Sequence, residues 1–201
     1  MTIEEVISLL DDTFDSVDIQ SSQLEGFCFE HGLIYRHGVT KFCLYDPHWD
    51  KVLKFTRFRS VIDDYCTIEY ENFLNAKKIG IDKIFLPVER VATLSSGIHV
   101  YAQTRFSSDF EHLPRPVYHS IKTKVNATRH GKIFHKSYGN VYQSYHIEDI
   151  WYARAYQIYG KRFMKELEAF TNRYRIGDLH SENVGFLGKM PIILDFSGYH
   201  G

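Results

Sequence analysis

The sequence has few cysteines and no long hydrophobic run. Cys28, Cys43 and Cys66 are odd in number, lie far apart and form no Cys-x-x-Cys pair, which argues against a disulfide framework or a zinc ribbon. No apolar run approaches the roughly 20 residues that span a bilayer, and the first residues are acidic where a signal peptide would be basic. We therefore expect a cytoplasmic protein with reduced cysteines and no membrane partner.

The chain also lacks a strong net charge, which is -1 over 201 residues. A chain of this length can bury one core or two small lobes that share a cleft. Charge is nevertheless uneven, because residues 1–25 hold seven acidic side chains and no Lys or Arg, whereas residues 115–136 hold only basic ones. The basic stretch would suit nucleic acid or a phosphorylated partner. We favour the alternative of a solvated or packed segment, and we do not expect nucleic acid as a partner.

Sequence patterns predict a short helix at the start of the chain and strands after it. Residues 3–10 place apolar side chains at helical spacing, with Thr2 as N-cap. From Gly26 the periodicity changes to that of strands. These strands should form a five-stranded antiparallel sheet, and they comprise residues 27–30, 39–45, 52–56, 88–94 and 98–106.

A helix is predicted between the third and fourth strands, at residues 62–79. At about 100° per residue its apolar side chains gather on one face, and Glu69 falls in the middle of that face. A carboxylate inside an apolar stripe is costly unless it is paired, so Glu69 should have a basic partner. Glu71 points the opposite way and is kept as the alternative, because the sequence fixes helix ends only to within several residues.

The most informative stretch lies near the end of the sequence. Asp178 precedes Asn183 by five residues, and Asp195 follows the apolar run of residues 191–194. Each of these side chains is a hard oxygen donor suited to a magnesium ion that carries phosphates. The pattern therefore predicts a phosphoryl-transfer site. The alternative is that Asp178 and Asn183 only cap turns and that Asp195 ends a strand.

Two segments carry a resemblance to a known family: Gly177-Asp178-Leu179-His180-Ser181-Glu182-Asn183 and Asp195-Phe196-Ser197-Gly198. They resemble the catalytic loop and the metal-binding segment of the protein-kinase-like superfamily, and the loop is closer to that of aminoglycoside phosphotransferases than to that of eukaryotic protein kinases. The resemblance implies ATP and Mg²⁺ as cofactors. It also implies that Asp178 orients or deprotonates the attacking hydroxyl, and that Asn183 and Asp195 hold metal ions.

The same resemblance assigns residues upstream. Lys54, on the third strand, should hold the phosphates and form an ion pair with Glu69. Gln103 and Arg105 should lie near the hinge that holds the adenine. In the place of the glycine-rich phosphate lid, residues 31–38, the chain keeps two glycines without the GxGxxG pattern; these are Gly32 and Gly38.

The segment between the last strand and the catalytic loop is harder to interpret. Residues 107–146 show no steady period, and we expect a basic insert of about residues 112–146 that packs on the larger lobe. His130 and His135 lack a carboxylate or cysteine at metal-ligand spacing, so zinc is not expected. A long helix over residues 147–173, divided at Gly160, should lead into the catalytic loop.

The expected architecture is an α+β, bilobal, protein-kinase-like fold with one helix inserted in the sheet of the N-lobe. An acidic arm (1–25) precedes the N-lobe (26–106) and a truncated helical C-lobe (107–201). Because only six residues follow Asp195, the peptide-docking platform is expected to be missing, as in the minimal kinase-like domains of some bacterial effectors and phage or mobile-element polyvalent proteins. The expected function is ATP- and Mg²⁺-dependent phosphoryl transfer to a hydroxyl of a protein or small molecule, or to the chain itself. The alternative is a pseudokinase that binds a nucleotide or a partner.

Overall fold

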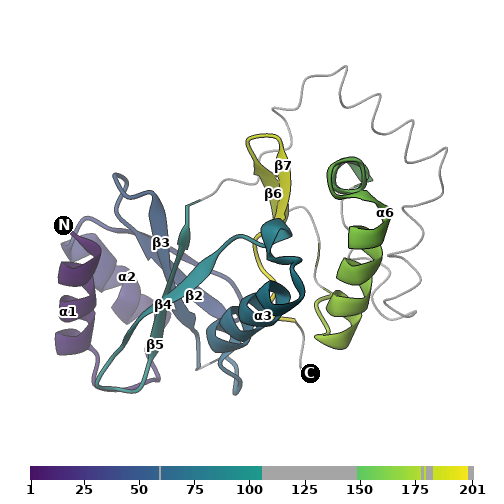
Figure 1. The fold of residues 1–201 in the computed structure, drawn as a ribbon. Helices are drawn as coiled ribbons and strands as arrows, with labels where there is room; N and C mark the ends of the chain where they lie inside the picture. The colour runs from purple at the N-terminus through teal and green to yellow at the C-terminus, as the bar shows by residue number, and fades with distance from the viewer. Residues whose placement is uncertain (59, 106–148, 178, 180–182, 199–201) are drawn as a thin grey trace. The chain divides into compact units, whose positions relative to one another are not determined.

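The chain of this computed structural model divides into two compact units (Figure 1). The first unit comprises residues 1–71 and 87–105. The second comprises residues 72–86 and the part of the chain that follows residue 105. The residues that the structure describes are 1–58, 60–105, 149–177, 179 and 183–198.

The first unit is built on a five-stranded antiparallel sheet, as the sequence predicts. Its strand order is β1-β2-β3-β5-β4, and the helix α3 (Tyr65–Ile79) follows β3 and precedes β4 in the chain. The mixed α+β class, the antiparallel sheet and the inserted helix are therefore confirmed. The strands are β1 (Ile34–His37), β2 (Lys41–Tyr45), β3 (Lys51–Thr56), β4 (Val88–Thr93) and β5 (His99–Thr104).

Two helices, α1 (Ile3–Thr13) and α2 (Ser21–Glu30), pack on one face of this sheet (Figure 1). Neighbouring strands bring apolar side chains together on that face, because directly paired residues of antiparallel strands point to the same side. The pairs Phe42 with Phe55 and Leu44 with Leu53 show this register. The resulting core joins these four side chains to Val6, Leu10, Leu24 and Phe27 of the helices.

Helix α1 begins where the sequence predicts. The Thr2 hydroxyl accepts a hydrogen bond from the backbone N–H of Glu5 at 3.2 Å, and the Glu5 carboxylate accepts one from the Thr2 N–H at 2.7 Å. This reciprocal capping satisfies two N–H groups that the helix itself leaves unpaired. The buried side chains Val6 and Leu10 then fix α1 to the sheet.

The prediction of a strand at residues 27–30 was wrong, because these residues end α2. Leu24, Phe27 and Cys28 are buried together, and their spacing of three and four residues is that of a helix. Gly32 follows the end of the helix at Glu30 and has a φ of +68°, and the Leu33 N–H donates to the Cys28 carbonyl at 2.8 Å. A glycine suits this position because other residues adopt a positive φ at a cost. The first strand is instead β1, which the sequence had assigned to the phosphate lid.

The second unit pairs a long helix with a small hairpin. Helix α6 (Asp149–Arg173) is interrupted at Gly160, where φ is 79° and ψ is 169°, so the predicted division at this glycine is confirmed. The hairpin consists of β6 (Val184–Leu187) and β7 (Met190–Ile193). The indole N–H of the buried Trp151 lies 3.0 Å from two carbonyl oxygens of the hairpin, those of Gly185 and Ile192.

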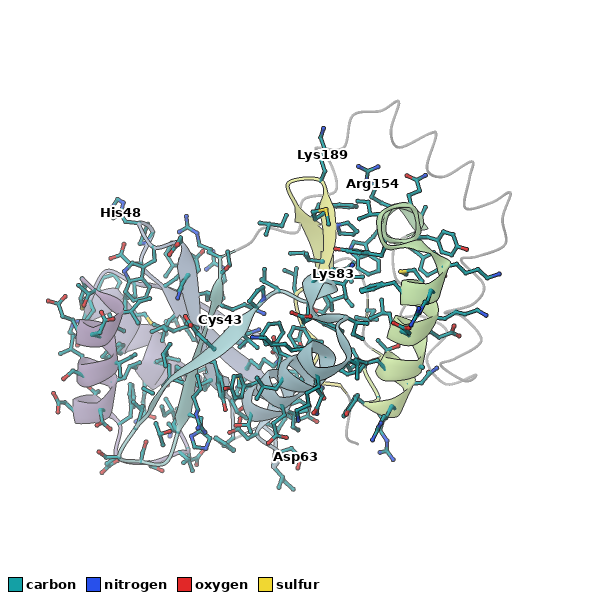
Figure 2. The ribbon with its side chains drawn as sticks, viewed as in Figure 1. Cys43, His48, Asp63, Lys83, Arg154 and Lys189 are labelled. Carbon is teal, nitrogen blue, oxygen red and sulfur yellow. The ribbon has the colours of Figure 1, made fainter. Side chains whose placement is uncertain are left out.

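A second set of contacts joins α6 to the short 3₁₀ helix η1 (Asp82–Ile84) and to the hairpin. The Tyr159 hydroxyl donates to the Pro191 carbonyl at 3.0 Å, and the Lys83 ammonium lies 4.9 Å from the centre of the Phe163 ring. Figure 2 shows Lys83 on η1, and Lys189 on the turn between β6 and β7. None of the helices that the structure describes combines the length and hydropathy that a membrane-spanning segment needs.

Candidate functional site

A cluster of charged side chains lies between the second face of the sheet and the first half of α3. The Glu69 carboxylate accepts hydrogen bonds from the Lys54 ammonium at 3.0 Å (Oε1) and 3.1 Å (Oε2). The Lys41 ammonium donates to Oε2 of the same carboxylate. Gln103 completes the cluster, because its Nε2 donates to Glu69 at 3.2 Å and its Oε1 accepts from Lys54 at 3.0 Å. We call these four residues the Glu69 cluster.

The Glu69 cluster is buried. Glu69 is 1% exposed, Lys41 4% and Lys54 7%. Taking charges out of water is costly, and the cluster tolerates it only because ion pairs and hydrogen bonds compensate for the lost hydration. The ion pair that the sequence predicts between Lys54 and Glu69 is thus present. Glu71 is exposed, which removes it as the alternative partner.

Helix α3 is held against the sheet by polar contacts at its beginning. The Thr56 hydroxyl, at the end of β3, donates to the Asp64 carboxylate at 2.5 Å and accepts from the Cys66 N–H at 3.0 Å. Asp64 also accepts from the Thr67 N–H at 3.0 Å, which caps the first turn of the helix. The Thr67 hydroxyl lies 2.6 Å from the hydroxyl of Tyr101 on β5. These contacts fix the orientation of α3 about its own axis, and in this orientation the Glu69 side chain faces the sheet.

Sequence analysis did not identify Lys41 as a member of the cluster. The signal that would have found it is the register of the hairpin formed by β2 and β3, in which Cys43 pairs with Lys54 and Lys41 pairs with Thr56. Side chains two residues apart on a strand share a face, so Lys41 and Lys54 must lie on the same side of the sheet. Their burial then indicates that anionic side chains lie on that side of the sheet.

Two cysteines lie close to the cluster. Cys43 is paired with Lys54 across the sheet and is half-buried (Figure 2). Cys66 is fully buried on α3, and burial strongly raises the pKa of its thiol. Cys66 therefore stays protonated at neutral pH and does not supply a second negative charge to the two lysines.

Gln103 and Arg105 were predicted to lie near an adenine-binding hinge. Gln103 lies on β5, where its side chain is buried within the Glu69 cluster. Arg105 holds the loop between β2 and β3. Its side-chain Nη1 donates to the Pro47 carbonyl at 2.7 Å, and its backbone N–H donates to the Asp50 carbonyl at 2.7 Å. The contacts of these two side chains account for their positions, and their role towards a nucleotide stays a prediction.

The two glycines of the predicted phosphate lid lie on opposite sides of β1. Gly32 follows the end of α2, whereas Gly38 follows β1 and its N–H donates to the Lys41 carbonyl at 3.0 Å. Only three residues, 38–40, separate β1 from β2. The connection between these strands is therefore a tight turn, much shorter than the segment 31–38 that the sequence assigned to the lid.

Asn183 and Asp195 lie at the same end of the hairpin of β6 and β7. Asn183 immediately precedes β6, and its carbonyl accepts a hydrogen bond of 2.8 Å from the N–H of Leu194, the residue before Asp195. The Asp195 carboxylate accepts from the Ser197 hydroxyl at 3.0 Å and from its N–H at 3.3 Å. The hairpin thus brings together two residues that the sequence separates by twelve positions.

The residues after Asp195 are held by contacts within the second unit. Phe196 is buried, its ring centre lies 4.8 Å from that of Phe85, and its carbonyl accepts from the Asn72 side chain at 2.8 Å. Gly198 has a φ of +78°, and a Cβ at this position would lie 2.7 Å from the Tyr174 carbonyl oxygen. A side chain at residue 198 would therefore force this segment away from the chain that follows α6.

The predicted catalytic residue Asp178 lies outside the described residues, as do His180 and the whole of the predicted basic insert. Among the side chains that the structure describes, no three His, Cys, Asp or Glu residues gather as a metal site would require. Magnesium nevertheless needs few protein ligands, because it keeps several waters and binds substrate phosphates beside one or two carboxylates. The oxygen donors of Asn183 and Asp195 fit that requirement.

In comparisons with known proteins, no protein-family model and no curated protein sequence matches this chain. The function must therefore be argued from the two sets of residues that the structure describes. One is the Glu69 cluster in the first unit, and the other is the pair formed by Asn183 and Asp195 in the second.

Proposed function

We propose that this protein is an ATP- and Mg²⁺-dependent phosphotransferase with a minimal protein-kinase-like fold. The observation that carries the proposal is the buried ion pair between Lys54, on the third strand, and Glu69, on the inserted helix. A lysine held by a helix glutamate in this sheet order is the arrangement by which kinases place the phosphates of ATP. The function is transfer of the γ-phosphoryl group to a hydroxyl of a protein, of a small molecule or of the chain itself.

The residues of the proposal have distinct tasks. Lys54 binds phosphate oxygens, with Glu69 and Gln103 holding its ammonium in place. Asn183 and Asp195 are the residues that would hold magnesium, which neutralises charge on the phosphates when it is bound. Asp178 orients the attacking hydroxyl. Positioning and charge neutralisation account for most of the rate enhancement in phosphoryl transfer, so this small set of groups suffices.

The test compares two lysines of the same strand. Lys51 is partly exposed and pairs with Glu89 at the surface, whereas Lys54 is buried in the Glu69 cluster. With radiolabelled ATP and magnesium, Lys54→Met and Asp195→Ala should abolish phosphoryl transfer and ATP hydrolysis, and Lys51→Met should leave both unchanged. Undiminished turnover in Lys54→Met and Asp195→Ala would refute the proposal.

A second candidate is a pseudokinase that binds a nucleotide without turning it over. The observation that favours it is the three-residue turn between β1 and β2, which leaves little backbone to cover the phosphates. This function predicts that ATP raises the melting temperature of the protein while no phosphate is transferred or released. Thermal unfolding with and without ATP, followed by a phosphate-release assay on the same sample, distinguishes the two candidates.

A further inference from the structure

Asn72 is a buried polar residue of the second unit that the proposed function leaves without a task. It lies on α3, is 3% exposed, and its side-chain Nδ2 donates to the Phe196 carbonyl at 2.8 Å. Burying an amide is costly unless it forms hydrogen bonds, and the bond to Phe196 offsets part of that cost. The carbonyl that Asn72 binds belongs to the residue directly after Asp195.

The peptide group between Phe196 and Ser197 connects Asn72 to the Asp195 carboxylate. This group is planar and trans, so its C=O and its N–H point in opposite directions. The C=O accepts from Asn72, and the N–H donates to Oδ1 of Asp195 at 3.3 Å. The Ser197 hydroxyl donates to the same oxygen at 3.0 Å. A rotation of the peptide plane that broke the bond to Asn72 would therefore also turn the N–H away from the carboxylate.

The chain before Asp195 is held by a different contact. The Leu194 N–H donates to the Asn183 carbonyl at 2.8 Å, so the end of the hairpin fixes the backbone that enters residue 195. The bond from Asn72 fixes the peptide group that follows it. Hydrogen bonds in sequence also polarise one another, so a carbonyl that accepts from Asn72 strengthens the N–H on the same peptide group as a donor.

We propose that Asn72 is a positioning residue for the metal-binding carboxylate of Asp195, and that it acts through the peptide group between Phe196 and Ser197. This inference rests on the proposed function, in which Asp195 holds magnesium. Magnesium demands nearly ideal octahedral geometry, so its affinity depends on the direction in which a carboxylate points. Groups that orient metal ligands typically change metal affinity by about 10- to 100-fold. Loss of the Asn72 amide should therefore weaken metal binding although every ligand is still present.

The experiment compares Asn72→Leu with Asn75→Leu, a control on the same helix. Leucine keeps the branched shape of asparagine but has no hydrogen-bond donor, and Asn75 is only half-buried, with its Oδ1 accepting from Lys78 at 3.0 Å. The probe is manganese without nucleotide, because it favours the same oxygen ligands as magnesium and its binding can be followed by electron paramagnetic resonance. Asn72→Leu should weaken manganese binding by about tenfold or more, whereas Asn75→Leu should stay within about twofold of wild type.

A second measurement separates positioning from a general loss of stability. Hydrogen exchange of backbone amides, followed by NMR, reports local opening of the structure. In Asn72→Leu the Ser197 amide should exchange about tenfold faster or more, while the amide of Leu167, which is buried on α6, keeps its wild-type rate. Equal acceleration of both amides would make Asn72 a purely structural residue and would overturn the proposal.

The outcomes also separate this proposal from the proposed function. If Asp195→Ala binds manganese as tightly as wild type, Asp195 holds no metal and both proposals fail. If Asp195→Ala loses manganese while Asn72→Leu binds it like Asn75→Leu, only the role of Asn72 is overturned. If Asn72→Leu does not fold, NMR of the wild type decides: saturating magnesium must shift the side-chain amide signals of Asn72 but not those of Asn75, and unshifted Asn72 signals refute the proposal.

Discussion

Replacing Glu69 with glutamine is expected to destabilise the first unit strongly. The substitution keeps the size of the side chain and one acceptor oxygen, but it leaves the buried ammonium groups of Lys41 and Lys54 without the carboxylate that they share. Removing one member of a buried ion pair costs about 3 to 5 kcal/mol. Because glutamine still accepts one hydrogen bond, we expect a loss near the lower limit, about 3 kcal/mol.

The assay is urea unfolding followed by circular dichroism, with Glu71→Gln as the matched control. Glu71 is on the same helix and is exposed, so its substitution should change stability by less than about 0.5 kcal/mol. In thermal unfolding, Glu69→Gln should lower the melting temperature by about 6 to 12 °C, because a chain of this size loses about 2 to 4 °C per kcal/mol. Equal stability of the Glu69→Gln and Glu71→Gln proteins would refute the burial argument.

A triple variant shows whether the charges themselves stabilise the fold. Lys41→Met, Lys54→Met and Glu69→Leu together remove all three charges and keep similar volumes. Replacing buried ion pairs by apolar residues is often neutral or stabilising, so this protein should be within about 1 kcal/mol of wild type or above it. A triple variant less stable than Glu69→Gln alone would contradict this reasoning and would assign the cluster a purely structural role.

Two further predictions concern other parts of the chain. Gly198→Ala should destabilise the second unit by more than about 2 kcal/mol in thermal unfolding. The control is Gly188→Ala, which also has a positive φ but no atom within 4 Å of the new Cβ. This control should cost only about 1 kcal/mol. Burial raises the pKa of the Cys28 thiol from its ordinary 9.0 to about 11. The protonated thiol thus contributes stability below about pH 9 that is lost as the pH rises to about 11. Urea unfolding of Cys28→Ala should therefore show a shallower decline over this pH range than the wild type, and parallel declines would show that Cys28 is not the cause.

Much of the first unit could be predicted because its signals are local. The hairpin of β2 and β3 alternates apolar and polar residues, and the 100° period of α3 distinguishes Glu69 from Glu71 without any tertiary information. The strand predicted at residues 27–30 was wrong because the periodicity from Gly26 onwards was interpreted as that of strands. In the structure Gly26 lies within α2, and the tertiary contacts of Leu24 and Phe27 outweigh its low helix propensity.

The parts of the site that the sequence did not predict depend on contacts between distant residues. Lys41 reaches Glu69 across 28 positions, and Asn72 reaches the Phe196 carbonyl across 124. No periodicity within one element carries such information. The register of the hairpin was nevertheless accessible, because the short connection at residues 46–50 fixes which residues of the two strands face each other.

The two faces of the sheet bury different kinds of side chain. Strands β2 and β3 place Phe42, Leu44, Leu53 and Phe55 on one face, where they form an apolar core with α1 and α2. On the other face the same strands place Lys41 and Lys54 against α3, which carries Glu69. Apolar side chains would pack this second face at no electrostatic cost, as they do on the first. Packing alone therefore does not explain the buried charges, and under the proposed function the place of Lys54 in this cluster would allow it to hold phosphate oxygens.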